Sequence, residues 1–218
     1  MISIFGGKEK SGGGAPTENV HSARHSSGWG QLLERLHSQV ELRVLDIGTT
    51  SSININFVTS LGHSIYLANL VEEASKPEWI VPEKDGEEEH FDVQRFLSTH
   101  LDFTGQAFDI VLFWDTADYL PEALLEPVLE RIHAIMAPGG QMLALFHSPT
   151  GTSSAGVEKA DFCRYHMTDT SKLEVQRAGN FPLRNHFSSR KIEKLLEAFH
   201  GHRFILGKDN VREVMVER

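Results

Sequence analysis

The sequence contains one cysteine, Cys163, among its 218 residues. A single thiol excludes an internal disulfide and cannot by itself form a thiolate metal site. No apolar run approaches the roughly 20 residues that are needed to span a bilayer. The first residues also lack the extended apolar stretch of a secretory signal. The sequence therefore predicts a cytoplasmic protein with no membrane partner.

Positive charge is also scarce. Lys and Arg number 21 against 30 Asp and Glu, which gives a formal net charge of −9. Eight of the acidic residues lie in the segment 72–89, where only Lys76 and Lys84 oppose them. A chain without a basic surface does not neutralise phosphates, so nucleic acid is not an expected partner. We interpret the acidic segment as a solvated loop in preference to a dedicated partner site.

Several catalytic and metal-binding motifs are missing. His147, His166 and His186, near the insertion, do not fall at His-x-x-x-His spacing on one helix, and scattered histidines are more often surface or core residues than metal ligands. The chain has no Gly-x-x-x-x-Gly-Lys phosphate loop and no persuasive Ser-His-Asp order. We therefore expect no metal site.

The sequence does contain an alternation of apolar strands and amphipathic helices. Strands are predicted at residues 43–48, 64–70, 108–115 and 141–146, with a terminal hairpin of 203–206 and 212–216. Helices are predicted from residue 27, over 52–61, over 91–100, after Pro121 and over 188–199. This alternation is typical of a three-layer α/β sandwich with a mostly parallel sheet and an antiparallel edge.

The domain organisation follows from the same pattern. Residues 1–26 are rich in Gly, Ser and His and are predicted to be a flexible tail. Residues 27–218 form one domain, since a chain of this size buries a single substantial core. Residues 149–187 break the alternation and are interpreted as an insertion, with extended pieces at 164–167 and 172–175.

The strand 43–48 ends in Asp46-Ile47-Gly48 before a helix. A strand that ends in Asp-x-Gly and leads into a helix usually opens a nucleotide-type cofactor site. Such sites continue with more glycines, whereas this chain continues with Thr49, Thr50 and two serines. Side chains at these positions crowd a ligand that normally lies against bare backbone.

These residues resemble the class I S-adenosylmethionine-dependent methyltransferases over about residues 27–218. Residues 44–48 are similar to the first strand and cofactor loop of that family, and residues 101–103 followed by 108–111 to the start of its fourth strand. Residues 137–140 are similar to its turn into strand five. The resemblance implies a Rossmann-like, mostly parallel seven-stranded sheet with an antiparallel C-terminal strand, and S-adenosylmethionine as the cofactor.

The resemblance also implies cofactor-binding positions. Asp46, Gly48 and Thr49 correspond to the cofactor loop. Asn69 stands where the family usually has a carboxylate that accepts from both ribose hydroxyls, and an amide accepts only through its oxygen. Leu97 falls near the position that is often an adenine-binding Asp. Ribose binding is therefore expected to be weaker here than in the family.

Polar side chains follow the strand 108–115, at the edge where open α/β sheets bind ligands. Asp115 is a candidate for cofactor binding and catalysis, and Asp118 and Tyr119 are candidates for contact with the acceptor. An alternative makes Asp115 or Asp118 a cap of the next helix. His147 lies just past the fifth strand and is the candidate general base.

Two functions remain open. One is methyl transfer to a small acceptor that enters beside Asp115, Asp118 and the insertion. The other is a catalytically inactive module with the same fold that binds a protein partner through the insertion or the acidic loop. An open slot between Gly48, Asn69 and Asp115 would favour the enzyme, whereas a slot filled by the side chains of residues 49–52 or by Leu97 would count against it. A third reading places an anionic ligand at the hydroxyl-rich start of the helix 52–61.

Overall fold

The computed structural model describes residues 21–83, 88–147, 161–207 and 209–218. At its centre is a six-stranded sheet with the strand order β10-β11-β7-β6-β2-β3. Its strands are β2 (Arg43–Ile47), β3 (Ser64–Ala68), β6 (Phe108–Trp114), β7 (Met136–His147), β10 (Gly201–Ile205) and β11 (Val211–Glu217). Strands β3, β2, β6 and β7 are parallel, and the C-terminal hairpin β10–β11 is antiparallel, which confirms the predicted edge.

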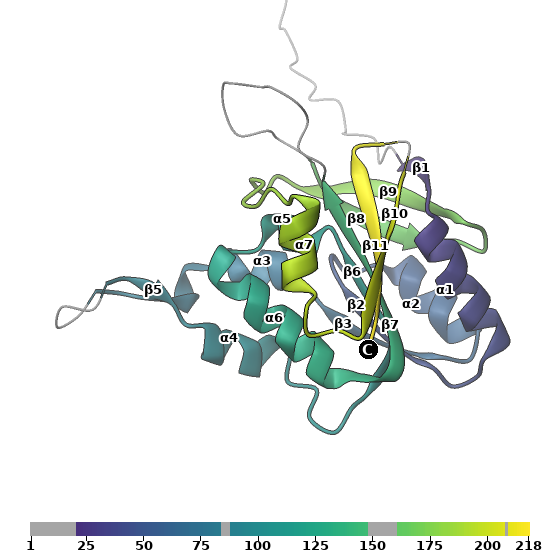
Figure 1. The fold of residues 1–218 in the computed structure, drawn as a ribbon, viewed down its shortest axis with the longest axis horizontal. Helices are drawn as coiled ribbons and strands as arrows, with labels where there is room; N and C mark the ends of the chain where they lie inside the picture. Colours follow the sequence, from purple (N-terminus) through teal and green to yellow (C-terminus); the bar gives the residue numbers. More distant parts are fainter. Residues whose placement is uncertain (1–20, 84–87, 148–160, 208) are drawn as a thin grey trace, which may run out of the picture.

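Helices cover both faces of this sheet (Figure 1). Helices α1 (Ser27–Ser38) and α2 (Ser52–Ser60) lie on one face, and α3 (Leu70–Ala74), α4 (Val93–His100), α6 (Glu122–Ile135) and α7 (Ser189–Leu195) lie on the other. Neighbouring strand residues point to opposite faces, so Val44 joins the core under α1 while Leu45 joins the core under α6. Both faces are buried, which explains the continuous apolar character of β6. Within the described residues, no helix is long and apolar enough to cross a membrane.

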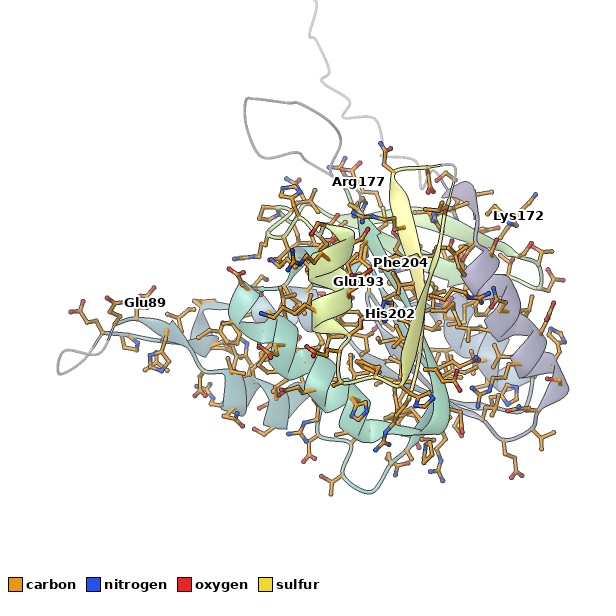
Figure 2. All side chains as sticks on the ribbon, in the orientation of Figure 1. Glu89, Lys172, Arg177, Glu193, His202 and Phe204 are labelled. Atoms are coloured by element: carbon orange, nitrogen blue, oxygen red, sulfur yellow. The ribbon has the colours of Figure 1, made fainter. Side chains whose placement is uncertain are left out.

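The prediction of seven strands is wrong for the described residues, because the central sheet has six. The acidic segment contributes no strand beside β3. It forms instead the short helix α3, a 3-10 turn (Pro77–Trp79) and a separate hairpin of β4 (Ile80–Val81) and β5 (His90–Phe91). Glutamate and lysine are poor strand formers, and they dominate this segment. Figure 2 shows Glu89 near the outer end of that hairpin.

A second sheet has the strand order β1-β9-β8 and is antiparallel throughout. Its strands are β1 (His21–His25), β8 (Phe162–Met167) and β9 (Lys172–Gly179). The last two confirm the extended pieces that were predicted within the insertion. Residues 21–25 are a paired strand rather than part of a flexible tail, and Ser26 is the buried N-cap of α1; residues 1–20 of the predicted tail lie outside the described residues. Strand β1 has no alternating apolar pattern, so its residues do not indicate a strand before the fold is known.

Candidate functional site

The carboxyl ends of the parallel strands β2, β3 and β6 meet at one edge of the central sheet, which we call the cofactor edge. It carries Gly48, Asn69 and Asp115. The backbone N–H of Gly48 donates to the carbonyl of Ala68 at 3.0 Å and joins the loop after β2 to the end of β3. Open α/β sheets bind ligands at this kind of edge. The order of the elements therefore positions the predicted residues together, as the sequence indicated.

Trp114, the last residue of β6, covers Gly48. A Cβ atom added to Gly48 would lie 2.8 Å from Trp114 Cδ1, so only glycine fits beneath the ring. The indole Nε1 of Trp114 donates to Asp46 Oδ1 at 2.6 Å. Trp114 has a φ of 41°, a left-handed conformation that costs a side-chain-bearing residue about 1–2 kcal/mol. The space beside Gly48 is therefore occupied by Trp114, so among the described residues the slot is not open at Gly48.

Tyr165 of strand β8 lies on the outer side of Trp114. The two rings are stacked, with centroids 5.1 Å apart and planes 13° from parallel. The Tyr165 hydroxyl donates to Asp115 Oδ2 at 3.1 Å. We call these two rings the Trp114–Tyr165 cover. Neither residue is among the site residues predicted from the sequence, although the run 114–119 does place aromatic groups beside the predicted cleft.

Side-chain hydrogen bonds of Asn54, in helix α2, hold strand β8 against the cofactor edge. Its Nδ2 donates to Asp46 Oδ2 at 3.0 Å and to the Tyr165 carbonyl at 2.9 Å, and its Oδ1 accepts from Met167 N at 2.8 Å. Ser51 caps α2 by accepting from Asn54 N, and its Oγ lies 2.7 Å from His166 Nδ1. The start of α2 is thus bonded to protein groups, which leaves the reading of an anion site there without support.

Two carboxyl groups at this edge are buried. Burial raises the pKa of Asp46 to about 6, although the hydrogen bonds from Asn54 and Trp114 oppose the shift. Burial also raises the pKa of Asp115 to about 7, where the charge of His147 opposes the shift and that of Asp118 adds to it. Both groups therefore titrate close to neutral pH.

We expect the protein to lose stability as the pH rises from about 5 to about 7. In the folded chain the pKa values of Asp46 and Asp115 lie above the ordinary value of 3.8, so both carboxyl groups bind a proton more tightly than in the unfolded chain. The stability that this proton binding contributes is present at low pH and is lost as the pH rises through the folded pKa values. The expected loss for the two groups together is about 3–4 kcal/mol in the free energy of unfolding. Urea unfolding at several pH values measures it. Asp115→Asn cannot titrate and should flatten the dependence; an equally steep curve in that variant would contradict this assignment.

His147 forms a close pair with Asp118. Asp118 Oδ2 accepts from His147 N at 2.9 Å and from His147 Nδ1 at 2.7 Å. A carboxylate only accepts hydrogen bonds, so Nδ1 carries the proton and Nε2 is the unprotonated nitrogen of the neutral ring. Burial lowers the pKa of His147, but the hydrogen bond and charge of Asp118 outweigh it and raise the pKa above its ordinary value. This is the arrangement of an oriented general base.

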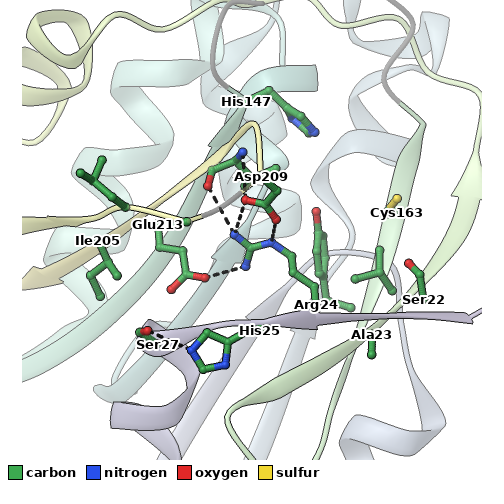
Figure 3. A pocket seen from close by; sticks show the side chains of 15 residues that line it. Ser22, Ala23, Arg24, His25, Ser27, His147, Cys163, Ile205, Asp209 and Glu213 are labelled. Carbon is green, nitrogen blue, oxygen red and sulfur yellow. Dashed lines mark hydrogen bonds and ion pairs between the residues drawn. The ribbon is translucent and has the colours of Figure 1, made fainter.

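His147 lies at the wall of a cavity of about 650 Å³ (Figure 3). The cavity lies between the second sheet and the C-terminal hairpin. Its apolar lining is Ala23, Val175, Ile205, Leu206 and Val211, and Cys163 and Tyr165 also face it. Tyr165 belongs both to this wall and to the cover over the cofactor edge, so the two sites share one side chain.

Arg24 of strand β1 lines one side of the cavity and forms ion pairs there. Its guanidinium pairs with Asp209 at 2.7 Å and with Glu213 at 2.6 Å (Figure 3). Glu213 also accepts from the backbone N–H of Gly28 at the start of α1. The charge of Arg24 is thus matched by protein carboxylates and is not available to an anionic ligand.

The predicted acceptor residues are brought together, but in different roles. Asp118 is fully buried and bonds His147, so it is not open to an acceptor. Tyr119 is buried, with its ring centroid 6.4 Å from that of His147. Asp115 precedes the short helix α5 (Thr116–Tyr119) without a capping hydrogen bond from its side chain, which removes support from the capping alternative for this residue.

Asn69, Thr49 and Leu97, the residues predicted near the nucleoside, differ in whether their side chains can reach a ligand. Asn69 Nδ2 donates to Glu72 Oε2 at 2.6 Å. Asn69 Oδ1 and Thr49 Oγ1 are buried and have no hydrogen-bond partner among the described residues. Leu97 is 4% exposed and packs in the core with Phe96, so its side chain is not presented to a ligand. Leu97 is therefore left out of the site proposed below.

Comparison with known proteins gives one family match and a set of similar folds. A family model described as a methyltransferase domain matches residues 21–200. The structure of an S-adenosylmethionine-dependent methyltransferase from Methanosarcina mazei is similar at 15% identity and a TM-score of 0.50, covering 85% of this chain and 96% of that one. The 1,6-didemethyltoxoflavin-N1-methyltransferase of Burkholderia thailandensis, solved with its bound substrate and S-adenosylhomocysteine, is 14% identical with a TM-score of 0.47 over 88% and 79% of the two chains. A search of curated protein sequences gave no match.

Proposed function

The chain belongs to the methyltransferase domain family, and from this premise we propose that it transfers a methyl group from S-adenosylmethionine to a small acceptor. The observation that carries the proposal is the His147–Asp118 pair at the wall of the cavity. The cavity adjoins the cofactor edge through Tyr165. The proposal therefore places the cofactor on the cofactor edge and the acceptor in the cavity.

The nucleoside end of the cofactor fits two unsatisfied side chains. Buried polar atoms without partners are rare, because each costs free energy comparable to a lost hydrogen bond. Asn69 Oδ1 and Thr49 Oγ1 are two such atoms, one at the end of β3 and the other directly after Gly48. The ribose hydroxyls are donors of the kind that both atoms lack. We infer that Asn69 and Thr49 hold the nucleoside.

Catalysis by the chain itself would consist of orientation and proton transfer. When bound, S-adenosylmethionine supplies an electrophilic methyl group on a positively charged sulfur. His147 Nε2 takes the proton from an O–H or N–H of the acceptor. Asp118 is the positioning residue, since it fixes the imidazole tautomer and stabilises the protonated ring. The apolar walls of the cavity hold the acceptor near His147 and exclude water.

The charges around the cavity favour a neutral or cationic acceptor. Among the described lining residues Arg24 is the one Lys or Arg, and Asp209 and Glu213 both neutralise it. Asp115 and Asp118 add negative potential at the His147 end. An anionic acceptor would meet carboxylates, and among the described lining residues no unpaired Lys or Arg is available to it. The excess of acidic residues over the whole chain likewise supports a small-molecule partner in preference to nucleic acid.

Asn69→Ala should weaken the binding of S-adenosylhomocysteine about tenfold, because it removes a hydrogen bond to the ribose. Isothermal titration measures the dissociation constants. Asn56→Ala is the matched control, since Asn56 is exposed on α2 and should change nothing. No binding to the native protein at millimolar ligand would contradict the proposal and would leave a module that uses its surface to bind a partner.

A further inference from the structure

We propose that Trp114 is a specificity-determining residue for the cofactor. The Trp114–Tyr165 cover occupies the place of the amino-acid end of S-adenosylmethionine and must move before that end binds, whereas the nucleoside end binds without this movement. This inference rests on the proposed function. Its supports are the contact with Gly48, the hydrogen bond to Asp46 and the backbone conformation of Trp114.

The contact with Gly48 shows that the ring takes the space of a ligand. Glycine at this position allows a group to approach the bare backbone, and here that group is the indole itself, which lies 2.8 Å from where a Cβ would stand. The resemblance to the methyltransferase family places the amino-acid end of the cofactor beside Asp46 and Gly48. The ring and the amino-acid end therefore compete for one place.

The hydrogen bonds of Asp46 allow one donor to be replaced by another. Asp46 Oδ1 accepts from Trp114 Nε1 and Oδ2 accepts from Asn54 Nδ2, so both carboxylate oxygens are satisfied while the cover is closed. An ammonium group is a stronger partner for a carboxylate than an indole N–H. The ammonium of the cofactor would thus replace the indole, and Asp46 would keep a partner throughout.

The closed position of Trp114 is strained as well as bonded. Its φ of 41° is unusual for a residue with a side chain, and such conformations persist only where surrounding contacts impose them. The stacking with Tyr165 and the Tyr165–Asp115 hydrogen bond are those contacts. Among the described residues, neither Asn69 nor Thr49 forms a hydrogen bond with the ring of Trp114 or Tyr165. A ligand that needs only these two residues does not have to open the cover.

The test compares two ligands with one variant. Trp114→Gly removes the ring and accepts the left-handed φ without strain. We expect isothermal titration to show S-adenosylhomocysteine bound at least about tenfold more tightly than by the native protein, since the cost of opening is gone. Adenosine should bind both proteins within about twofold of each other, because it has no amino-acid end. Trp79→Phe, a buried change in another core, is the matched control and should alter neither affinity.

Each outcome decides between the claims. Equal S-adenosylhomocysteine affinity in native protein and variant overturns the role of Trp114 and leaves the proposed function standing. No binding of either ligand to either protein overturns both. Equal tightening for adenosine also overturns the specificity role. If circular dichroism shows that Trp114→Gly is unfolded, Trp114→Phe replaces it, because it keeps a ring but removes the donor to Asp46.

A fluorescence measurement follows the ring directly. The chain has three tryptophans, so Trp29→Phe with Trp79→Phe leaves Trp114 alone. Trp114 is 3% exposed. We expect S-adenosylhomocysteine to shift its emission to longer wavelength as the ring leaves its buried place, and adenosine to leave the emission unchanged. An unchanged spectrum at saturating S-adenosylhomocysteine overturns the inference.

Discussion

His147→Ala should lower methyl transfer by about 10²- to 10⁴-fold, the usual effect of removing a general base. His147 lines the cavity and Asp118 orients its ring, so this change removes the proposed proton acceptor. The assay follows labelled methyl from S-adenosylmethionine into a panel of neutral and cationic hydroxyl and amine compounds. The acid limb of the native pH profile should lie above the ordinary histidine value of 6.5, because the pKa of His147 is raised.

Two control variants distinguish the loss of the base from the loss of another histidine and from a change in the charge beside the base. His202→Ala removes an exposed histidine on the edge strand β10 (Figure 2) and should leave turnover unchanged. Asp118→Asn keeps a hydrogen-bonding side chain but removes the charge that raises the pKa of His147, so the acid limb should move to lower pH. Turnover in His147→Ala above about a third of the native value would contradict the role of His147 as the base.

Asn54→Ala should lower the free energy of unfolding by about 3–5 kcal/mol. The change leaves the Tyr165 carbonyl and the Met167 N–H without their partner, and each unpaired buried group costs about 1–3 kcal/mol. It also removes one donor from the buried Asp46. Urea unfolding measures the loss.

Asn56→Ala is the matched variant for this measurement. Asn56 is exposed two residues further along the same helix, so its loss should change stability by less than about 0.5 kcal/mol. A loss below about 1 kcal/mol in Asn54→Ala would mean that Asn54 does not fasten β8 over the cofactor edge, and the support for the Trp114–Tyr165 cover would weaken with it.

The central sheet could be predicted where local pattern and burial agree. Strand β6 is apolar throughout because helices cover both of its faces, and helix α6 presents an inward stripe of leucine, valine and isoleucine. The expected seventh strand had no such pattern of its own and came from family resemblance. Strand β1 pairs with β9 across about 150 residues, and its polar sequence gives no local signal.

The site was only partly predictable for a similar reason. The roles of Asp46, Gly48 and Asn69 could be predicted from their places at or just after strand ends, and that of His147 from its place at the end of the predicted strand 141–146, where it is the last residue of β7. The position of Trp114 depends on a backbone φ that the sequence does not mark. Tyr165 reaches the cofactor edge only because the second sheet folds across it. The Asp118–His147 bond likewise joins helix α5, which follows β6, to the last residue of β7.

A crystal structure of the native protein with saturating S-adenosylhomocysteine tests the central claim most directly. The account predicts the ribose hydroxyls within hydrogen-bonding distance of Asn69 Oδ1 and Thr49 Oγ1. It also predicts that the indole of Trp114 has left Gly48 and that the amino group lies against Asp46. A ligand bound away from the cofactor edge, or an empty edge with Trp114 still on Gly48, would contradict it.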